Sequence, residues 1–100
     1  MNHLKSVLIV VLLLSCFHVN GRQESDSIRL GILLDSTNRL IDERGFGGAT
    51  DAATYLLDEA DKSGLDYFKV VARLRLSMIK MALDDYEQST KEAVEAMAIA

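Results

Sequence analysis

The sequence predicts an all-α fold in which antiparallel helix pairs stack side by side. Three observations lead to this prediction. Apolar residues beyond Arg22 recur at helical spacing, and no segment of useful length alternates as a strand does. Glycine, aspartate and serine interrupt this pattern where short helices would begin and end. The second half of the chain also repeats the first, with Leu30 falling on Val70 and Phe46 on Tyr86.

The first helix pair is expected to occupy the chain from Ser25 to Ser63. The stretch 25–27 offers N-cap side chains for the first helix of this pair. This helix is expected to end at Arg44-Gly45, with a basic residue in its last turn and a glycine after it. The second helix is expected from about Gly48 to Ser63, stopped by Gly64. The apolar faces predicted for these two helices are Leu30, Leu33, Leu34, Thr37, Leu40 and Ile41, then Ala49, Ala52, Ala53, Leu56, Leu57 and Ala60.

The second helix pair is expected to follow Gly64. Asp66 is placed to cap a third helix, and Asp84-Asp85 to close a short turn and cap a fourth. The fourth helix reaches Ala100 without a glycine, basic turn or polar closing segment, so we expect the chain to continue and residues 22–100 alone to be marginally stable. The predicted apolar faces are Val70, Val71, Leu74, Ser77, Met78 and Met81, then Tyr86, Ser89, Ala93, Val94, Met97 and Ala100.

The spacing from residue 30 to residue 70, which we call the repeat offset, pairs residues of like character on the predicted inward faces. We interpret the agreement as a true repeat, the alternative being two ordinary amphipathic hairpins that share the helical period. The pairs are Leu30 with Val70, Leu34 with Leu74, Thr37 with Ser77, Ile41 with Met81, Phe46 with Tyr86, Ala49 with Ser89, Ala53 with Ala93, Leu57 with Met97 and Ala60 with Ala100.

The stretch from Leu74 to Ala100 resembles a tetratricopeptide repeat (TPR). The resemblance lies in Leu76-Ser77, in Asp85-Tyr86 at the turn and in the small residues that follow, whereas Arg73 and Lys80 depart from it. The repeat offset resembles the long TPR variant found in bacterial regulators and sensor proteins. The resemblance covers residues 25–100 and implies a solenoid of about two repeats. The residues to which it assigns repeat packing are Leu34, Thr37, Phe46, Ala49, Ala53, Leu74, Ser77, Tyr86, Ser89, Ala93 and Ala96.

Residues 1–21 have the three parts of an export signal. Lys5 is the positive residue, 7–14 is an unbroken apolar stretch, and Val19-Asn20-Gly21 suits a signal peptidase that leaves Arg22 as the first mature residue. The apolar segment falls short of the roughly 20 residues that a membrane-spanning helix needs. We therefore expect an exported protein of the periplasm or cell envelope.

A second cleavage site competes with the first. Leu13-Leu14-Ser15-Cys16 resembles a bacterial lipobox, in which residues 1–15 are removed and Cys16 is lipidated. The sequence leaves both alternatives open. Membrane association is expected only through such a lipid or through a transmembrane helix downstream of Ala100.

Composition excludes several classes of function for residues 22–100. Lys5 is the only charged residue before Arg22, so this region holds 10 of the 11 basic residues and all 15 acidic ones, with no Cys, His, Trp or Pro. Thiolate and imidazole chemistry, disulfides and a nucleophile–histidine pair are therefore excluded. The acidic balance argues against nucleic acid as a partner. We expect no cofactor, no metal and no catalytic residue in residues 1–100, and leave a longer parent chain open.

The glycine-rich and acidic motifs of the sequence are interpreted as structural and not as ligand-binding or catalytic. Residues 45–50 are glycine-rich but lack the strand and the Lys-Ser/Thr pair of a phosphate loop, so we expect a turn with Phe46 as its apolar plug. Residues 59–64 resemble half of a calcium loop, but Val70 occupies the position of its closing carboxylate. The adjacent acids 58–59 and 84–85 point about 100° apart on a helix, so neither pair converges on one atom.

The leading functional hypothesis is an extracytoplasmic scaffold that binds a protein or peptide. In the TPR family, side chains of the first helix of each pair line a groove that holds peptides. The resemblance implies Asp35, Asn38, Asp42, Arg75 and Met78 as partner-binding candidates here. One alternative is the sensory region of a membrane histidine kinase or transcriptional regulator, and another is a small secreted helical-bundle enzyme or carrier.

Overall fold

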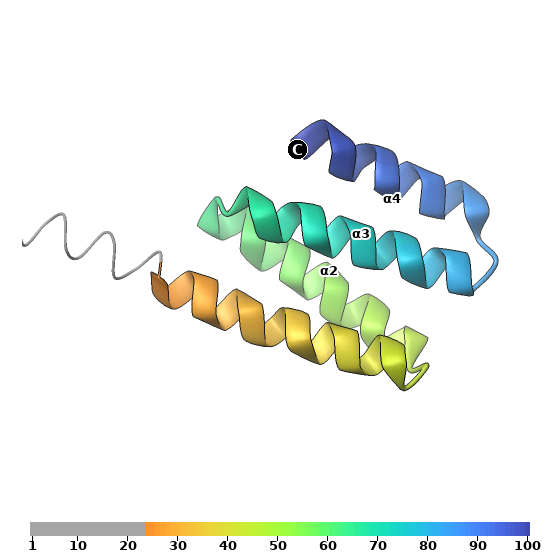
Figure 1. The fold of residues 1–100 in the computed structure, drawn as a ribbon, viewed down its shortest axis with the longest axis horizontal. Helices are drawn as coiled ribbons and strands as arrows, with labels where there is room; N and C mark the ends of the chain where they lie inside the picture. Colours follow the sequence, from red (N-terminus) through yellow and green to blue (C-terminus); the bar gives the residue numbers. More distant parts are fainter. Residues whose placement is uncertain (1–23) are drawn as a thin grey trace, which may run out of the picture.

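The computed structural model describes residues 24–100, which are helical apart from three short connections and Ala100 and contain no strand. The predicted leader and Cys16 lie outside the described residues. The described helices are the segment 24–42, α2 (Phe46–Ser63), α3 (Asp66–Ala82) and α4 (Tyr86–Ile99), and successive helices run antiparallel (Figure 1). The prediction of an all-α fold is confirmed for this part of the chain.

The connections 43–45 and 83–85, one repeat offset apart, share one backbone geometry. Arg44 and Asp84 both have a left-handed backbone, with φ of 59° and 62°. In each turn this residue's amide donates to the carbonyl three residues earlier at 3.0 Å, and the next amide donates to the carbonyl five residues before it at 2.8 Å. The following helices begin at equivalent residues, Phe46 and Tyr86. The repeat offset therefore recurs in the backbone.

Gly64 ends α2, as predicted. Its φ of 68° is left-handed, and the amides of the C-cap donate to the carbonyls of Ala60 and Asp61. Asp66 does not cap the next helix, contrary to prediction. Leu65 is the N-cap residue of α3 and makes no side-chain cap bond, while Asp66 is the first helical residue and pairs with Lys69.

The predicted starts of two other helices were wrong. Residues 25–27 lie inside the helical segment 24–42 rather than capping it. The helix α2 begins at Phe46 instead of Gly48, because the turn already orients the chain and the Ala49 amide bonds to the Gly45 carbonyl at 2.8 Å. Asp85 does cap α4, accepting a hydrogen bond from the Gln88 amide at 3.3 Å.

Two apolar clusters join the segment 24–42, α2 and α3. The predicted stripes of the first two helices supply most of their members, so those two predictions are confirmed. Thr37 is also fully buried, and its hydroxyl donates to the Leu33 carbonyl at 2.8 Å, which satisfies it locally. The buried members are Leu30, Leu56, Ala60, Phe68 and Ala72 in the upper cluster, and Ala49, Ala53, Leu76 and Ile79 in the lower cluster.

The stripe predicted for α3 was wrong, because this helix is apolar on more than one side. The residues that α3 buries are Phe68, Ala72, Leu76 and Ile79, on the face toward the earlier helices. Leu74, Met78 and Met81, which were expected to be inward, are exposed. Helix periodicity does not determine which apolar side meets the larger neighbouring surface.

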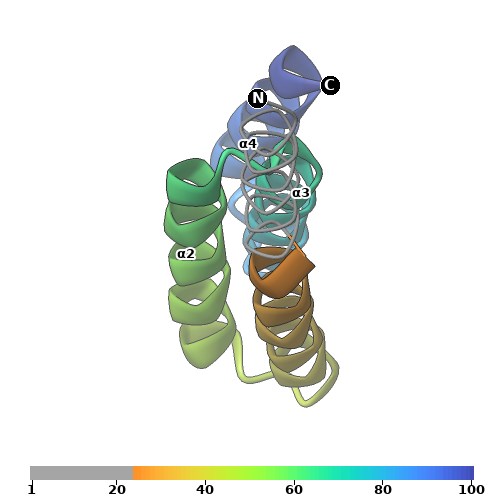
Figure 2. The ribbon, with the colours of Figure 1, turned by 90° about the vertical axis from the view of Figure 1, so that its left-hand side faces the viewer.

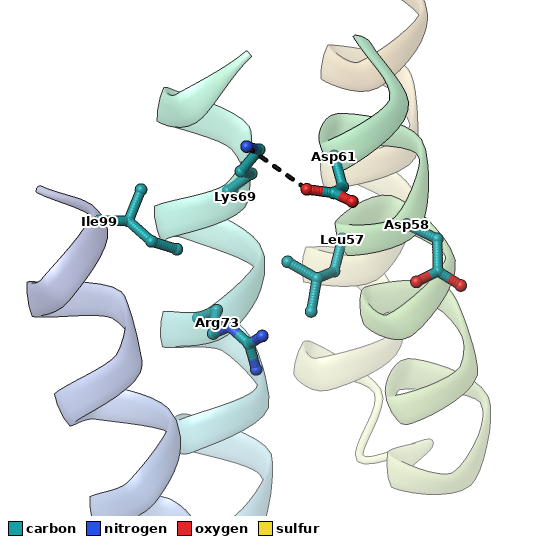
Figure 3. Close-up of a pocket in the computed structure, with 6 residues that line it drawn as sticks. All are labelled: Leu57, Asp58, Asp61, Lys69, Arg73 and Ile99. Atoms are coloured by element: carbon teal, nitrogen blue, oxygen red, sulfur yellow. Dashed lines mark ion pairs between the residues drawn. The ribbon is translucent and has the colours of Figure 1, made fainter. Parts of the chain in front are cut away.

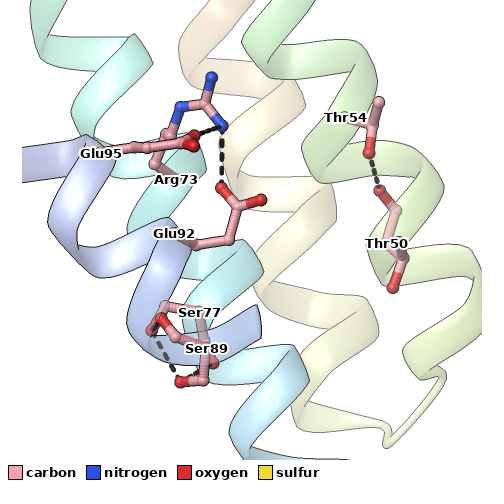
Figure 4. Close-up of polar contacts among 7 residues, drawn as sticks. All are labelled: Thr50, Thr54, Arg73, Ser77, Ser89, Glu92 and Glu95. Carbon is pink, nitrogen blue, oxygen red and sulfur yellow. Dashed lines mark hydrogen bonds and ion pairs between the residues drawn. The ribbon is translucent and has the colours of Figure 1, made fainter. Parts of the chain in front are cut away.

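The helix α4 packs against α3 through small residues. Ser77 and Ser89 exchange hydrogen bonds, each hydroxyl donating to the other's carbonyl at 2.9 Å (Figure 4). Ser89 and Ala96 are buried and Ala93 is half-buried. The outer apolar residues of this helix, which were expected to pack, are instead exposed, because no described element covers them: Tyr86, Val94 and Met97.

The helices are arranged so that α3 lies between the segment 24–42 and α4, with α2 to one side (Figures 1 and 2). Contacts agree with these views, because α3 packs against both α2 and α4. One surface of α3 therefore meets the first helix pair and another meets α4. This arrangement positions the two candidate sites described next.

Candidate functional site

Three of the five predicted partner-binding residues meet across the two helix pairs. Arg75 of α3 donates from Nε to Oδ1 of Asn38 at 2.7 Å, and its Nη1 lies 3.7 Å from Sδ of Met78. Asn38 and Arg75 are half-buried, while Met78 is about half exposed. We call these three residues the Arg75 cluster. A guanidinium has five N–H donors, so Arg75 keeps donors for a ligand beyond the one that Asn38 uses.

Asp35 and Asp42 flank the Arg75 cluster without joining it. They share a helix face with Asn38 because the spacings of three and four residues place all three side chains on one side. Both aspartates are exposed, and within 24–100 neither carboxylate has a hydrogen-bond or ion-pair partner. The structure thus places a cation and an amide between two free carboxylates.

A second candidate site, which sequence reasoning missed, is a cavity that lies over α3 between α2 and α4. Its volume is about 310 Å³. Leu57 and Ile99 contribute its apolar walls, from α2 and α4 respectively, and Figure 3 shows these side chains on either side of α3. The charged residues that line it are Asp58, Asp61, Lys69 and Arg73.

Ion pairs hold the cations of this cavity. Nη1 of Arg73 lies 2.9 Å from Oε2 of Glu92 and 2.6 Å from Oε2 of Glu95, so α3 is tied to α4 (Figure 4). Nζ of Lys69 reaches Asp61 at 3.4 Å and so ties α3 to α2 (Figure 3). The buried Nε of Arg73 has no partner among the described residues. The signal in the sequence was Lys69 and Arg73 one turn apart, facing acids at helical spacing on the neighbouring helices.

The perturbed titratable groups are all held in their charged forms. The Arg29 hydrogen bond, at 2.9 Å, lowers the pKa of Glu59, and the same bond raises the pKa of Arg29. A hydrogen bond to Asp66, with a second to Asp61, raises the pKa of Lys69. Shifts in these directions keep all three groups ionised at neutral pH, so they serve as ion pairs and not as proton-transfer groups.

The described residues also bear on metals and membranes. Within 24–100, no three His, Cys, Asp or Glu side chains are grouped so that they could hold a metal ion. No helix of this region combines the length and the apolar character needed to cross a bilayer. In the adjacent acid pairs 58–59 and 84–85, one residue of each pair has a structural role: Asp85 caps α4 and Glu59 forms an ion pair with Arg29.

Comparisons with family models, with curated proteins and with solved structures find no match to this chain. Any functional proposal therefore depends on the geometry described above and on motifs in the sequence.

Proposed function

We propose that residues 24–100 form a TPR-like scaffold that binds a protein or peptide and performs no catalysis. The observation that carries this proposal is the repeated turn at 43–45 and 83–85, with the same φ values to within a few degrees and the same hydrogen-bond lengths. A backbone unit that recurs at a fixed interval along the chain, with matching helix starts, is the property that defines a helical repeat protein.

The packing of α3 supports the stacking of repeats. This helix buries one face against the segment 24–42 and α2 and meets α4 with another. Each repeat unit of a solenoid likewise contacts its neighbour through such a shared helix. The ion pair between Lys69 and Asp61 adds a polar connection across this boundary, and the ion pair between Arg73 and Glu92 joins α3 to α4 within the second pair.

The Arg75 cluster is the proposed ligand surface. Asn38 and Arg75 offer an amide and a guanidinium that suit peptide carbonyls and carboxylates, and Met78 offers an adaptable apolar contact. Asp35 and Asp42 are free to meet a basic side chain on either side. Because rigid helices hold these groups in place before binding, little ordering entropy opposes association.

We also propose that the protein is exported and works in the periplasm or cell envelope of a bacterium. This proposal depends on Lys5, the apolar stretch 7–14 and the two cleavage motifs. The intact mass of the protein recovered from the envelope distinguishes the alternatives. A chain that begins at Arg22 indicates an ordinary signal, and an acylated chain that begins at Cys16 indicates a lipoprotein.

The scaffold proposal is tested by selecting peptides from a random display library on the purified protein and measuring their affinity. We expect Arg75→Gln to weaken the selected peptides at least tenfold, which corresponds to about 1.4 kcal/mol. Lys91→Gln is the matched control, because it removes the same charge from an exposed position on α4. A library that yields no reproducible peptide, or peptides equally tight on both variants, contradicts the proposal for this surface.

A further inference from the structure

The second helix pair exposes the positions through which the first pair packs. In the first pair, six half-buried apolar residues lie against the clusters that α3 completes, and two of them, Leu33 and Leu40, have the charged equivalents Arg73 and Lys80. The other four are Leu34, Ile41, Phe46 and Leu57. One repeat offset later, the equivalent of each of these four is apolar and open to solvent. Leu74 is 39% exposed, Met81 57%, Tyr86 62% and Met97 69%. We call these four exposed residues the C-terminal face.

The opposite end of the stack exposes the complementary positions. The residues that α3 presents to the first pair are Phe68, Ala72, Leu76 and Ile79. One repeat offset earlier, the segment 24–42 carries Ile28, Ile32, Ser36 and Arg39, which we call the N-terminal face. Ile28 and Ile32 are 61% and 62% exposed, and Arg39 is also exposed.

The two faces match in polarity from one end to the other. In the register of the first interface, Ile28 and Ile32 take the places of Phe68 and Ala72 in the upper cluster, against which Leu57 also packs. Met97 is the residue equivalent to Leu57. The apolar half of one face therefore meets the apolar half of the other.

The polar halves also correspond. Phe46 packs against the lower cluster, which contains Ile79. Its equivalent is Tyr86, and the equivalent of Ile79 is Arg39, so one position on each side of the interface becomes more polar. A guanidinium over a tyrosine ring is a favourable cation–π arrangement. The exposed acids Asp84 and Glu87 flank Tyr86, which adds charge complementarity to Arg39.

We propose that the C-terminal face docks on the N-terminal face of a second copy of this chain. The copies stack head to tail, and the contact continues the register by which the first helix pair packs on α3. Such a contact is heterologous, so each copy keeps one free face and the assembly grows beyond a dimer. This self-association goes beyond the proposed peptide binding and uses none of the Arg75 cluster.

The test is the weight-average mass of the chain without its leader, beginning at Arg22, measured by sedimentation up to a concentration of about 1 mM. We expect the wild-type mass to rise with concentration past that of a dimer. Ile32→Lys and Met97→Lys each place a charge on one face only, and we expect each variant to be monomeric.

Mixing the two variants is the decisive arm. The Ile32→Lys chain keeps its C-terminal face and the Met97→Lys chain keeps its N-terminal face, so an equimolar mixture should form a heterodimer and nothing larger. Tyr55→Lys is the matched control, because Tyr55 is 52% exposed but belongs to neither face, and this variant should associate as the wild type does. All three variants should keep the wild-type helical circular dichroism.

Three results would overturn the proposal. The first is a wild-type chain that stays monomeric throughout the concentration range, which would leave the C-terminal face to a further helix pair of a longer protein. The second is an association that survives both substitutions and so arises elsewhere in the chain. The third is an Ile32→Lys chain that still dimerises, which indicates a symmetric contact between two C-terminal faces. Peptide affinity of the monomeric variants, measured in parallel, reports on the scaffold proposal separately.

Discussion

Truncation of Leu56 measures how strongly the upper cluster holds three helices together. Leu56 is fully buried and lies with Leu30, Ala60, Phe68 and Ala72, so the segment 24–42, α2 and α3 all meet around it. A buried Leu→Ala substitution costs about 2–5 kcal/mol, more where neighbours cannot fill the space. Two of the neighbours are alanines, which have no rotamer that reaches the cavity.

We therefore expect Leu56→Ala to lower the free energy of unfolding by about 4 kcal/mol. A domain of this size has a total stability of roughly 4–12 kcal/mol. With a urea m-value near 1 kcal/mol/M, the midpoint falls by about 4 M. Urea unfolding followed by helical circular dichroism measures this shift. If the variant is already unfolded without urea, Leu56→Val removes less volume and should cost about 1 kcal/mol.

The matched control is Leu83→Ala, which removes the same atoms from a residue that is 52% exposed at the end of α3. We expect this substitution to change stability by no more than about 0.5 kcal/mol. Equal losses at Leu56 and Leu83 would refute the reasoning, because the upper cluster would then not be the core that joins the helices.

Three further substitutions test particular contacts. Ala53→Trp should unfold the protein because Ala53 is fully buried. Ala93→Trp should lower the melting temperature far less because Ala93 is half-buried. Equal melting temperatures of the two variants would contradict this difference. Ser89→Ala removes the hydroxyl bond to α3 and should cost about 1 kcal/mol, or a fall in Tm of about 4–8 °C, and an unchanged Tm argues against that bond. The lowered pKa of Glu59 means that its pair with Arg29 stabilises the fold at neutral pH, and this stabilisation is lost as pH falls through the acidic range near pH 4. Glu59→Gln should therefore make the free energy of unfolding depend less on pH in this range. The same pH dependence in both proteins would show that the pair contributes nothing.

Two of the turn residues, Gly64 and Asp85, were predicted correctly, whereas Arg44 and not Gly45 takes the left-handed conformation after the segment 24–42. Gly64 and Asp85 act through their own backbone or side chain on amides a few residues away, so their roles can be derived from local sequence. The start of α2 was predicted two residues late because Gly47-Gly48 suggested a loop. The repeated turn geometry overrides that preference, since the hydrogen bonds of residues 43–45 direct the chain into the helix at Phe46.

Some residues of the candidate sites could also be predicted from the sequence, and others could not. Asn38, Arg75 and Met78 were predicted from repeat positions, and the structure brings them together across two helices. Arg73 was noted only as a departure from the repeat pattern. Its role depends on Glu92 and Glu95 of α4, and their approach depends on how α3 and α4 cross. No local pattern determines that crossing.

The sequence by itself determined the number of helices in the described region, the end of α2 at Gly64 and the recurrence of the turn, because each depends on backbone preferences within a few residues. Tertiary structure alone decided which side of α3 is buried, which charges meet over the cavity and which apolar residues stay exposed at Met81 and Met97. The physical reason is that a residue is buried only where a second surface packs against its own. A helix with apolar residues on two sides buries the side on which a neighbour packs, and the position of that neighbour depends on the whole fold.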